Sequence, residues 1–329
     1  MTEALTVRGL SLDGASLTTR AVAAAARAGS PEVQLSDAAR AQMEAALPLK
    51  WSLIEQGIPI YGVTTGFGDS CIRQIGADKA HELQRNLVLY HLNGTGPAAP
   101  AEVARATMMI RANSVSRGTS AIRPEVVNTL LEHLRADILP QIPERGSLGA
   151  SGDLVPLCYV AASLIGEGEV THKGESRPAL DALLDEGIDP VILEPKEGLA
   201  LINGTSYTAG WAVLALWDAR EIAIVAELAT AMTVEALLGN ASAFHPFIHQ
   251  NKPHPGQVAS AASLRALLDG SQLAISFEDI LIRREVIGDR GYVQLAESER
   301  IQDKYSVRCV PQIVGILRDT IDWADRWVE

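Results

Sequence analysis

The residues whose types and order suggest the most unusual reactivity are Ala150, Ser151 and Gly152. They lie in a glycine- and serine-rich stretch between Gly146 and Asp153. The unhindered nitrogen of Gly152 can attack the Ala150 carbonyl carbon. Loss of water from that adduct and from the Ser151 side chain leaves a five-membered ring with an exocyclic methylene. Such a methylene is an electrophile, which none of the twenty side chains supplies. An ordinary tight turn, in which glycine gives backbone freedom before a helix, is the alternative interpretation.

An apolar helix is expected to follow this stretch directly, from Leu154 to Ile165. Its N-terminus carries the positive end of the helix dipole, which suits Asp153 and would raise the electrophilicity of a ring formed beside it. Ser151 is a poor candidate for a hydrolase nucleophile, because the Gly-x-Ser-x-Gly spacing and a recognisable histidine partner are both lacking. A self-formed electrophile and an ordinary turn before a helix are therefore the two interpretations of this stretch.

Composition excludes several classes of protein. The chain has 329 residues, of which 47% are hydrophobic and 21% are charged, and this balance is typical of a soluble globular protein. A net charge of −12 argues against nucleic-acid binding. No apolar stretch is long enough to span a bilayer, and Met1–Ala4 does not open a signal-peptide pattern. Three widely separated cysteines fit a reducing compartment, so we expect a cytoplasmic protein.

The spacing of apolar residues predicts a mainly α fold with few strands. A helix of roughly 33 residues, about 50 Å long, is expected from Ser206 to about Leu238. A helix of this length indicates an elongated helical bundle shared between subunits. We expect a first domain at residues 1–200 and the first part of the bundle at 201–329. Two loops rich in glycine and polar residues are expected at 60–70 and 197–205, and a hairpin at 168–175 with its turn at Lys173-Gly174.

Three histidines, His245, His249 and His254, invite a metal interpretation because the first two have the ligand spacing of a helix. Pro246 and Pro255 would interrupt such a helix, and this region is expected to be an irregular loop. No carboxylate or cysteine lies close by in sequence. We therefore expect no metal site.

The sequence resembles the family of MIO-dependent aromatic amino acid ammonia-lyases and 2,3-aminomutases, from about residue 15 to its end. MIO is 4-methylidene-imidazol-5-one, the ring that Ala150, Ser151 and Gly152 would form. The resemblance is carried by five segments, which also follow the family's order: Tyr61–Gly68, Leu83–Val88, Gly149–Asp153, Glu197–Thr205 and Gln302–Gln312.

The resemblance implies a fumarase/aspartase-like (L-aspartase-like) fold, with an N-terminal MIO-forming domain at 1–200 and a bundle of long helices. It implies MIO as the cofactor, with no external cofactor, and a homotetramer with shared active sites. Family members continue well beyond the last residue of this sequence. We therefore expect either a truncated chain or a split subunit whose missing C-terminal part is supplied by a separate chain.

The resemblance also implies roles for individual residues. Tyr61 would be the general base on the substrate β-proton, and a phenol can do this when hydrogen bonds or positive charge stabilise its phenolate. Asn203 would hydrogen-bond the amino acid or the MIO, and Arg308 would bind the substrate carboxylate through its forked guanidinium. The remaining residues, expected to contact substrate or MIO from a neighbouring subunit, are Gln302, Tyr305 and Gln312.

Tyr90 and His91 occupy the position where the family sets its preference for the aryl group. A histidine there can hydrogen-bond a phenol or an imidazole, so tyrosine is favoured as substrate, histidine is next, and phenylalanine is less favoured. Asp69 in the Tyr61 loop is a candidate for control of the lid and of selectivity. The expected reaction is loss of ammonia to give an aryl acrylate. The alternatives are an aminomutase that makes a β-amino acid, and a subunit that is inactive without its C-terminal part.

Overall fold

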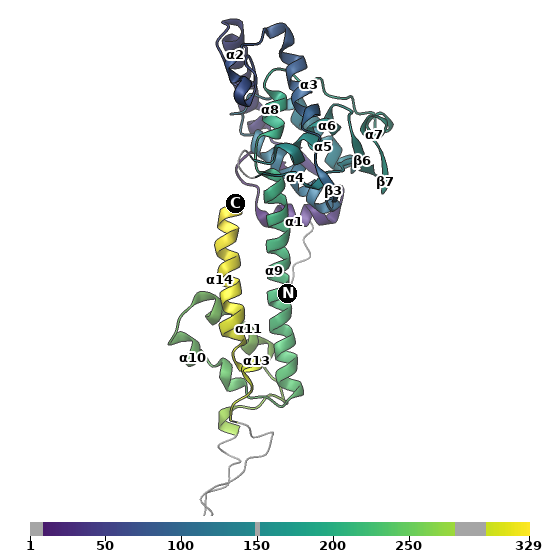
Figure 1. Cartoon of the computed structure of the whole chain (residues 1–329). Helices are drawn as coiled ribbons and strands as arrows, with labels where there is room; N and C mark the ends of the chain where they lie inside the picture. The colour runs from purple at the N-terminus through teal and green to yellow at the C-terminus, as the bar shows by residue number, and fades with distance from the viewer. Residues whose placement is uncertain (1–8, 149–151, 280–300) are drawn as a thin grey trace, which may run out of the picture. The chain divides into compact units, whose positions relative to one another are not determined.

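The structure is a computed structural model that describes residues 9–148, 152–279 and 301–329 (Figure 1). The chain divides into two compact units, one formed by residues up to Leu214 with Val328–Glu329, the other by Ala215–Trp327. The division falls inside the long helix α9, Ser206–Ala236, and therefore later than the boundary expected at residue 200. The assignment of residues 1–200 as the MIO-forming domain stays a prediction.

The first unit is built mainly from helices (Figure 1), and these helices bury most of its apolar side chains between them. Its helices are α1 (Thr19–Ala28), α2 (Asp37–Glu55), α3 (Ala80–Tyr90), α4 (Ala101–Val115), α5 (Pro124–Ala136), α6 (Leu154–Leu164), α7 (Ala179–Asp185), α8 (Glu197–Ile202) and the start of α9. Two short 3₁₀ helices, η1 (Gly68–Ile72) and η2 (Ala77–Lys79), precede α3.

Local sequence signals account for several of these helices. The Ser36 hydroxyl accepts the Ala39 N–H at 3.1 Å and so caps α2. Pro124 is the first residue of α5, where its missing N–H costs nothing, and Asp137 ends that helix in the left-handed conformation. The buried helix expected after Asp153 is confirmed as α6, which is apolar nearly all round.

Three small sheets complete the first unit. Strands β1 (Leu10–Leu12) and β2 (Val33–Leu35) pair in parallel, and β3 (Thr95–Ala98) pairs antiparallel with β5 (Pro143–Arg145). The third sheet has the order β4-β6-β7, with strands Leu139–Pro140, Glu169–His172 and Glu175–Pro178. The hairpin predicted at 168–175 is confirmed, and both residues of its turn, Lys173 and Gly174, have positive φ.

The second unit contains the rest of α9, η3 (Ala241–Phe244), α10 (Pro246–Gln250), α11 (Pro255–Leu267), α13 (Tyr305–Arg308) and, up to Trp327, α14 (Val310–Val328). The predicted long helix is confirmed at 31 residues, or about 46 Å. Gly256 of α11 and Gly315 of α14 lie where an added Cβ would collide with the facing backbone, so the two helices cross closely. Glu227 of α9 accepts from Arg318 of α14 at 2.6 Å.

The prediction of an irregular loop around the three histidines is wrong in part. Pro246 and Pro255 each open a helix, α10 and α11, instead of interrupting one. The Nδ1 atom of His245 caps α10 by accepting the Phe247 N–H at 3.2 Å. Within the described ranges, no group of three or more His, Cys, Asp or Glu side chains is arranged to hold a metal ion. The same ranges contain no helix that is both long and apolar enough to cross a membrane.

Candidate active site

Tyr61 lies in the loop between α2 and η1, with about half of its surface exposed. The Gly68 N–H donates to the Tyr61 phenol oxygen at 3.0 Å. The Tyr61 ring also makes an edge-on contact with Phe67, at a centroid distance of 6.2 Å. The loop expected at 60–70 is thus confirmed up to residue 67. It folds so that the Tyr61 side chain contacts Phe67 and Gly68 at the end of the loop. A donor at the phenol oxygen is a contact that an anionic oxygen strengthens.

The base of this loop is fixed by buried hydroxyl groups. The Thr64 hydroxyl accepts the Ile60 N–H at 2.8 Å and donates to the Ile58 carbonyl at 2.9 Å. The Thr65 hydroxyl accepts the Gly62 N–H at 3.1 Å. Asp69 lies further along, in the exposed first turn of η1, and no hydrogen bond of its side chain is seen among the described residues. Its selectivity role stays a prediction.

Of the three predicted cofactor-forming residues, Ala150 and Ser151 lie outside the described residues. Gly152 is described, and it has a positive φ of 83°. A Cβ on Gly152 would come within 2.5 Å of the Gly204 carbonyl oxygen, so only glycine fits this backbone contact. The next residue, Asp153, donates its N–H to the same Gly204 oxygen at 2.7 Å. The chain after the Ala-Ser-Gly motif is thereby held against the residue that follows Asn203.

The Asp153 carboxylate is buried. Asp153 directly precedes α6, but its carboxylate caps the other helix, α9. It accepts the Thr208 N–H at 2.8 Å and the Thr208 hydroxyl at 2.7 Å, at the first turn of α9. The Ser147 hydroxyl donates to it at 2.6 Å. Asp153 makes no cap bond to α6 itself. The N-termini of α6 and α9 therefore meet at Asp153, and both helix dipoles present their positive ends there.

The prediction of a loop at 197–205 is wrong for the first six residues, which form helix α8. Lys196 precedes the helix in the left-handed conformation and gives no side-chain cap. The contacts that define α8 come instead from distant residues, and local sequence carries no signal of them. Asn203 is exposed directly after the helix, and Gly204 follows.

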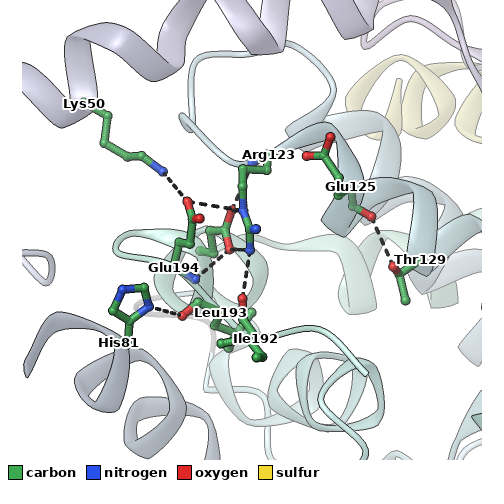
Figure 2. Close-up of polar contacts among 9 residues, drawn as sticks. Lys50, His81, Arg123, Glu125, Thr129, Ile192, Leu193 and Glu194 are labelled. Carbon is green, nitrogen blue, oxygen red and sulfur yellow. Dashed lines mark hydrogen bonds and ion pairs between the residues drawn. The ribbon is translucent and has the colours of Figure 1, made fainter. Parts of the chain in front are cut away.

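An ion pair between the half-buried Arg123 and a fully buried carboxylate holds the start of α8 (Figure 2). The Glu197 carboxylate has no exposed surface and accepts from the Arg123 guanidinium at 2.8 and 2.9 Å. It also accepts the Glu194 N–H at 2.8 Å. Figure 2 shows Lys50 of α2 reaching toward Glu194, with Nζ 3.9 Å from the carboxylate. The hydrogen bonds that Arg123 donates to Glu197 raise the pKa of Arg123, and burial lowers the pKa of Lys50.

The end of α8 is held by Arg111, a residue that sequence analysis did not select. Its buried guanidinium donates to the Ala200 carbonyl and, at 3.1 Å, to the Asn203 carbonyl. Burial lowers the pKa of Arg111 to about 10. Gly204 has no room for a side chain, because a Cβ would collide with this guanidinium. An arginine within the apolar run of α4 was the signal that could have identified it.

Tyr90 and His91 end helix α3 and stack on each other, with ring centroids 4.4 Å apart. The His91 Nδ1 lies 2.8 Å from the Leu87 carbonyl oxygen, which can only accept, so Nδ1 carries the proton. In the neutral ring this leaves Nε2 as an acceptor. Partial burial raises the pKa of Tyr90, and Cys158 and Tyr61 add to the shift.

The other predicted site residues belong to the second unit. The Arg308 guanidinium stacks on the Tyr305 ring, 4.1 Å from its centroid. A cavity of about 300 Å³ is lined by Gln302, Arg308 and Gln312 among other residues. Two buried polar atoms, Arg308 Nε and Gln312 Oε1, have no hydrogen-bond partner among the described residues. An anion such as a carboxylate would satisfy the arginine nitrogen.

The site residues thus form two groups, one in each compact unit. In the first unit, the Tyr61 loop packs on α8, Gly152 contacts the Gly204 that follows Asn203, and Tyr90 and His91 lie at the end of α3. The second unit brings together Gln302, Arg308 and Gln312 around one cavity, beside Tyr305.

The mainly helical architecture, with the 31-residue helix α9, is that of the aspartase-like MIO enzymes. The solved structure of tyrosine aminomutase from Streptomyces globisporus matches with a TM-score of 0.88 and 38% sequence identity, over 98% of this chain and 60% of that one. Residues 17–329 match the family model described as aromatic amino acid lyase. The chain belongs to the aromatic amino acid lyase family.

Curated relatives carry both lyase and aminomutase names. A histidine ammonia-lyase from Deinococcus radiodurans is 43% identical over 295 residues, which cover 90% of this chain and 53% of the relative. An MIO-dependent tyrosine 2,3-aminomutase from Streptomyces globisporus is 42% identical over 316 residues, which cover 95% of this chain and 58% of the relative. The chain therefore spans little more than half the length of these relatives.

Proposed function

We propose that this chain carries part of the active site of an enzyme that eliminates ammonia, without oxidation, from an aromatic L-amino acid to give an aryl acrylate. The observation that carries the proposal is the contact of Gly152 and Asp153 with the Gly204 carbonyl. It joins the Ala-Ser-Gly motif to the Asn203 segment, as a ring and its amide partner require. Membership of the aromatic amino acid lyase family supports the same reaction class.

The residues beside the motif fit an MIO group. Gly152 has a conformation and a packing contact that only glycine tolerates, and two helix N-termini converge on Asp153. MIO would be formed from Ala150, Ser151 and Gly152, and it would supply the electrophile that turns the substrate amine into a leaving group. No external cofactor is proposed.

The chain's own side chains would then bind the substrate and move its proton. Tyr61 would remove the β-proton, with the Gly68 N–H supporting negative charge on its oxygen. Arg308 would bind the carboxylate in its cavity, helped by Gln302 and Gln312. Asn203 would hydrogen-bond the amino acid, and Tyr305 would stack on Arg308 and keep it oriented.

We infer tyrosine as the favoured substrate and histidine as the next. The protonated Nδ1 of His91 leaves Nε2 as an acceptor, which can receive a phenol O–H or an imidazole N–H. A phenyl ring offers no donor and would leave this nitrogen unsatisfied. Asp69, in the first turn of η1 after the Tyr61 loop, would influence the lid and the selectivity.

An aromatic 2,3-aminomutase is the second candidate function. It is favoured by the similarity to the tyrosine 2,3-aminomutase, at 42% identity, and by the fold match to the solved tyrosine aminomutase. In that case ammonia would return at the β-carbon, and the product would be a β-amino acid.

We also propose a cytoplasmic homotetramer with shared active sites. Apolar side chains lie exposed on α9 and α14 of the second unit, and faces of this kind are covered by association in stable proteins. They include Ile224, Leu228, Met232, Ile313, Ile316 and Trp323. Light scattering should give about four times the 35.1 kDa chain mass, and an active monomer would contradict this assembly.

The proposed activity is tested by incubating the protein with tyrosine, histidine or phenylalanine. Ultraviolet absorbance would detect the aryl acrylates, and chromatography would detect β-tyrosine. The assay is run with the chain alone and with a polypeptide that corresponds to the C-terminal part of its relatives. This comparison also tests the third alternative, a subunit that needs that part for turnover.

Intact mass provides the control for MIO. The unmodified sequence should be lighter than calculated by two water molecules, and Ser151→Ala should have its calculated mass and no activity. Full activity of Ser151→Ala would rule out the proposed chemistry.

A further inference from the structure

A buried glutamine on α3, Gln84, joins the Tyr61 loop to helix α8. Its side chain has no exposed surface. The Nε2 atom donates to the Gly62 carbonyl at 2.9 Å, and the Oε1 atom accepts the Leu199 N–H at 3.1 Å. One amide group thus contacts two segments that are 137 residues apart in sequence (199 − 62) and that carry Tyr61 and Asn203.

Helix α8 needs this contact because it has no local cap. The first N–H groups of a helix find no partner within it, and Leu199 is the third residue of α8. The residue before the helix, Lys196, makes no side-chain cap bond. Gln84 therefore fulfils from a distance the role that a serine or aspartate usually has at an N-cap.

The same helix packs directly on Gln84. A Cβ on Gly198 would lie 2.8 Å from the Gln84 carbonyl oxygen, so α8 approaches α3 as closely as a glycine permits. On the other side, a Cβ on Gly62 would lie 2.8 Å from the Leu199 side chain and 2.5 Å from the Phe67 ring. The loop, the glutamine and α8 therefore form one packed layer, in which a displacement of one member is felt by the others.

We propose that Gln84 is a positioning residue that sets the placement of Tyr61 relative to Asn203. The inference rests on the proposed function, because that function makes the placement of Tyr61 relative to Asn203 important for catalysis. Gln84 touches neither reacting atoms nor substrate in this role. It acts through the Gly62 carbonyl, one peptide away from Tyr61, and through α8, whose last turn leads into Asn203.

The first test compares Gln84→Leu with the unmodified protein in the complete assembly that shows activity. Because a catalytic group misplaced by about 1 Å costs about 100-fold in rate, kcat should fall between about 10- and 100-fold while KM changes little. The deuterium isotope effect on kcat for β-deuterated substrate should rise, since proton removal by Tyr61 becomes slower. A change in KM with kcat unchanged would overturn the inference.

Gln84→Glu gives a signature that a purely structural role would not produce. When protonated, the introduced carboxyl group can still donate to the Gly62 carbonyl and accept from Leu199. When ionised, it loses the donor and faces the carbonyl oxygen with a negative charge. Burial raises the pKa of such a carboxyl group, so the ratio of variant to unmodified kcat should rise as the pH falls. A ratio that does not change with pH would count against the inference.

Amide hydrogen exchange tests the link without any activity. Gln84→Leu should speed exchange in peptides covering 60–68 and 197–204 together, and should leave the β6–β7 hairpin unchanged. Gln257→Leu is the matched control, because it removes another buried glutamine, bonded to His249 in the second unit. It should leave both peptides unaffected.

The outcomes separate the two proposals. Faster exchange in only one of the two peptides, or equal effects of Gln84→Leu and Gln257→Leu on them, would overturn the role of Gln84. If no aromatic amino acid is converted but both peptides exchange faster, the proposed function fails and the structural link stands.

Discussion

Gly152 is the residue at which backbone geometry and proposed chemistry coincide. Its φ of 83° is costly for any residue with a Cβ, and its α-carbon faces the Gly204 carbonyl oxygen. Gly187 has a similar φ of 68° but open space around it. The two glycines therefore allow the conformational cost of a side chain to be separated from the cost of a collision.

We predict that Gly152→Ala destabilises the protein by roughly 2–4 kcal/mol, from left-handed strain together with the clash against Gly204. Gly187→Ala should cost only about 1 kcal/mol, from strain alone. Chemical denaturation gives both values, and intact mass should show the loss of two waters in Gly187→Ala but not in Gly152→Ala. Equal destabilisation by the two substitutions would show that the Gly204 contact is unimportant.

At the residue scale, sequence identified the groups that carry chemistry and missed those that hold them. Tyr61, Gly152 and Asn203 could be selected because their types suit a reaction and their motifs are local. Arg111 contacts carbonyl groups 89 and 92 residues away in sequence, Gln84 contacts partners 22 and 115 residues away, and no local pattern predicts such partners. The only signal for Arg111 is the apolar run Met108–Ile110 before it, and Gln84 lies among the polar residues of α3 and has no such signal.

At the scale of elements, α8 and α9 share an unusual feature, since distant side chains cap both of them. Gln84 serves α8, and Asp153 serves α9. This explains why the sequence predicted a loop at 197–205: six residues containing a glycine, without a local cap, have weak helical signals. The 31-residue α9 was predictable because periodicity over many turns outweighs the nature of its ends.

We predict that Glu197→Ala lowers the free energy of unfolding by roughly 3 kcal/mol, because the Arg123 guanidinium and the Glu194 N–H lose their fully buried acceptor and Arg123 keeps only the partly exposed Glu194 carboxylate, at 3.3 Å. Thermal or urea unfolding measures the change. Glu167→Ala is the control, since it removes an ion pair with Arg85 in which both side chains are largely exposed, and it should cost less than about 1 kcal/mol. Equal effects of the two substitutions would contradict the importance of burial.

At the scale of the whole molecule, the stability of the fold should depend on one buried histidine. His133 of α5 has no exposed surface, and burial lowers its pKa from 6.5 to about 4. Its Nδ1 hydrogen bond with the Thr129 carbonyl opposes this shift only in part. Between pH 6.5 and 4 the unfolded chain therefore binds a proton that the folded chain does not.

Stability from this group is present above pH 6.5 and should be lost as the pH falls toward 4, by a total of about 3 kcal/mol. Urea denaturation at a series of pH values measures the slope. His133→Asn retains a donor that can face Thr129 but no longer titrates, and its slope in this window should be flatter. An unchanged slope would assign the acid sensitivity to other groups.

The whole-molecule organisation was only partly predictable. The mainly helical class follows from periodicity, and the aspartase-like fold followed from the joint match of five motifs in order. The division into compact units occurs within α9, where the helical pattern is continuous and sequence gives no sign of a boundary. A boundary inside a helix depends on which side chains pack beside it, and that is a tertiary property.

The bond between Asp153 and Thr208 sets an order of events during synthesis. Thr208 follows Asp153 by 55 residues, and Gly204, which receives the Asp153 N–H, also lies far downstream. A ribosome must therefore release the chain beyond the start of α9 before the Ala-Ser-Gly motif can be held in place. Under the proposed function, ring closure would be a late event, and its mass change would record that the surrounding chain had already folded.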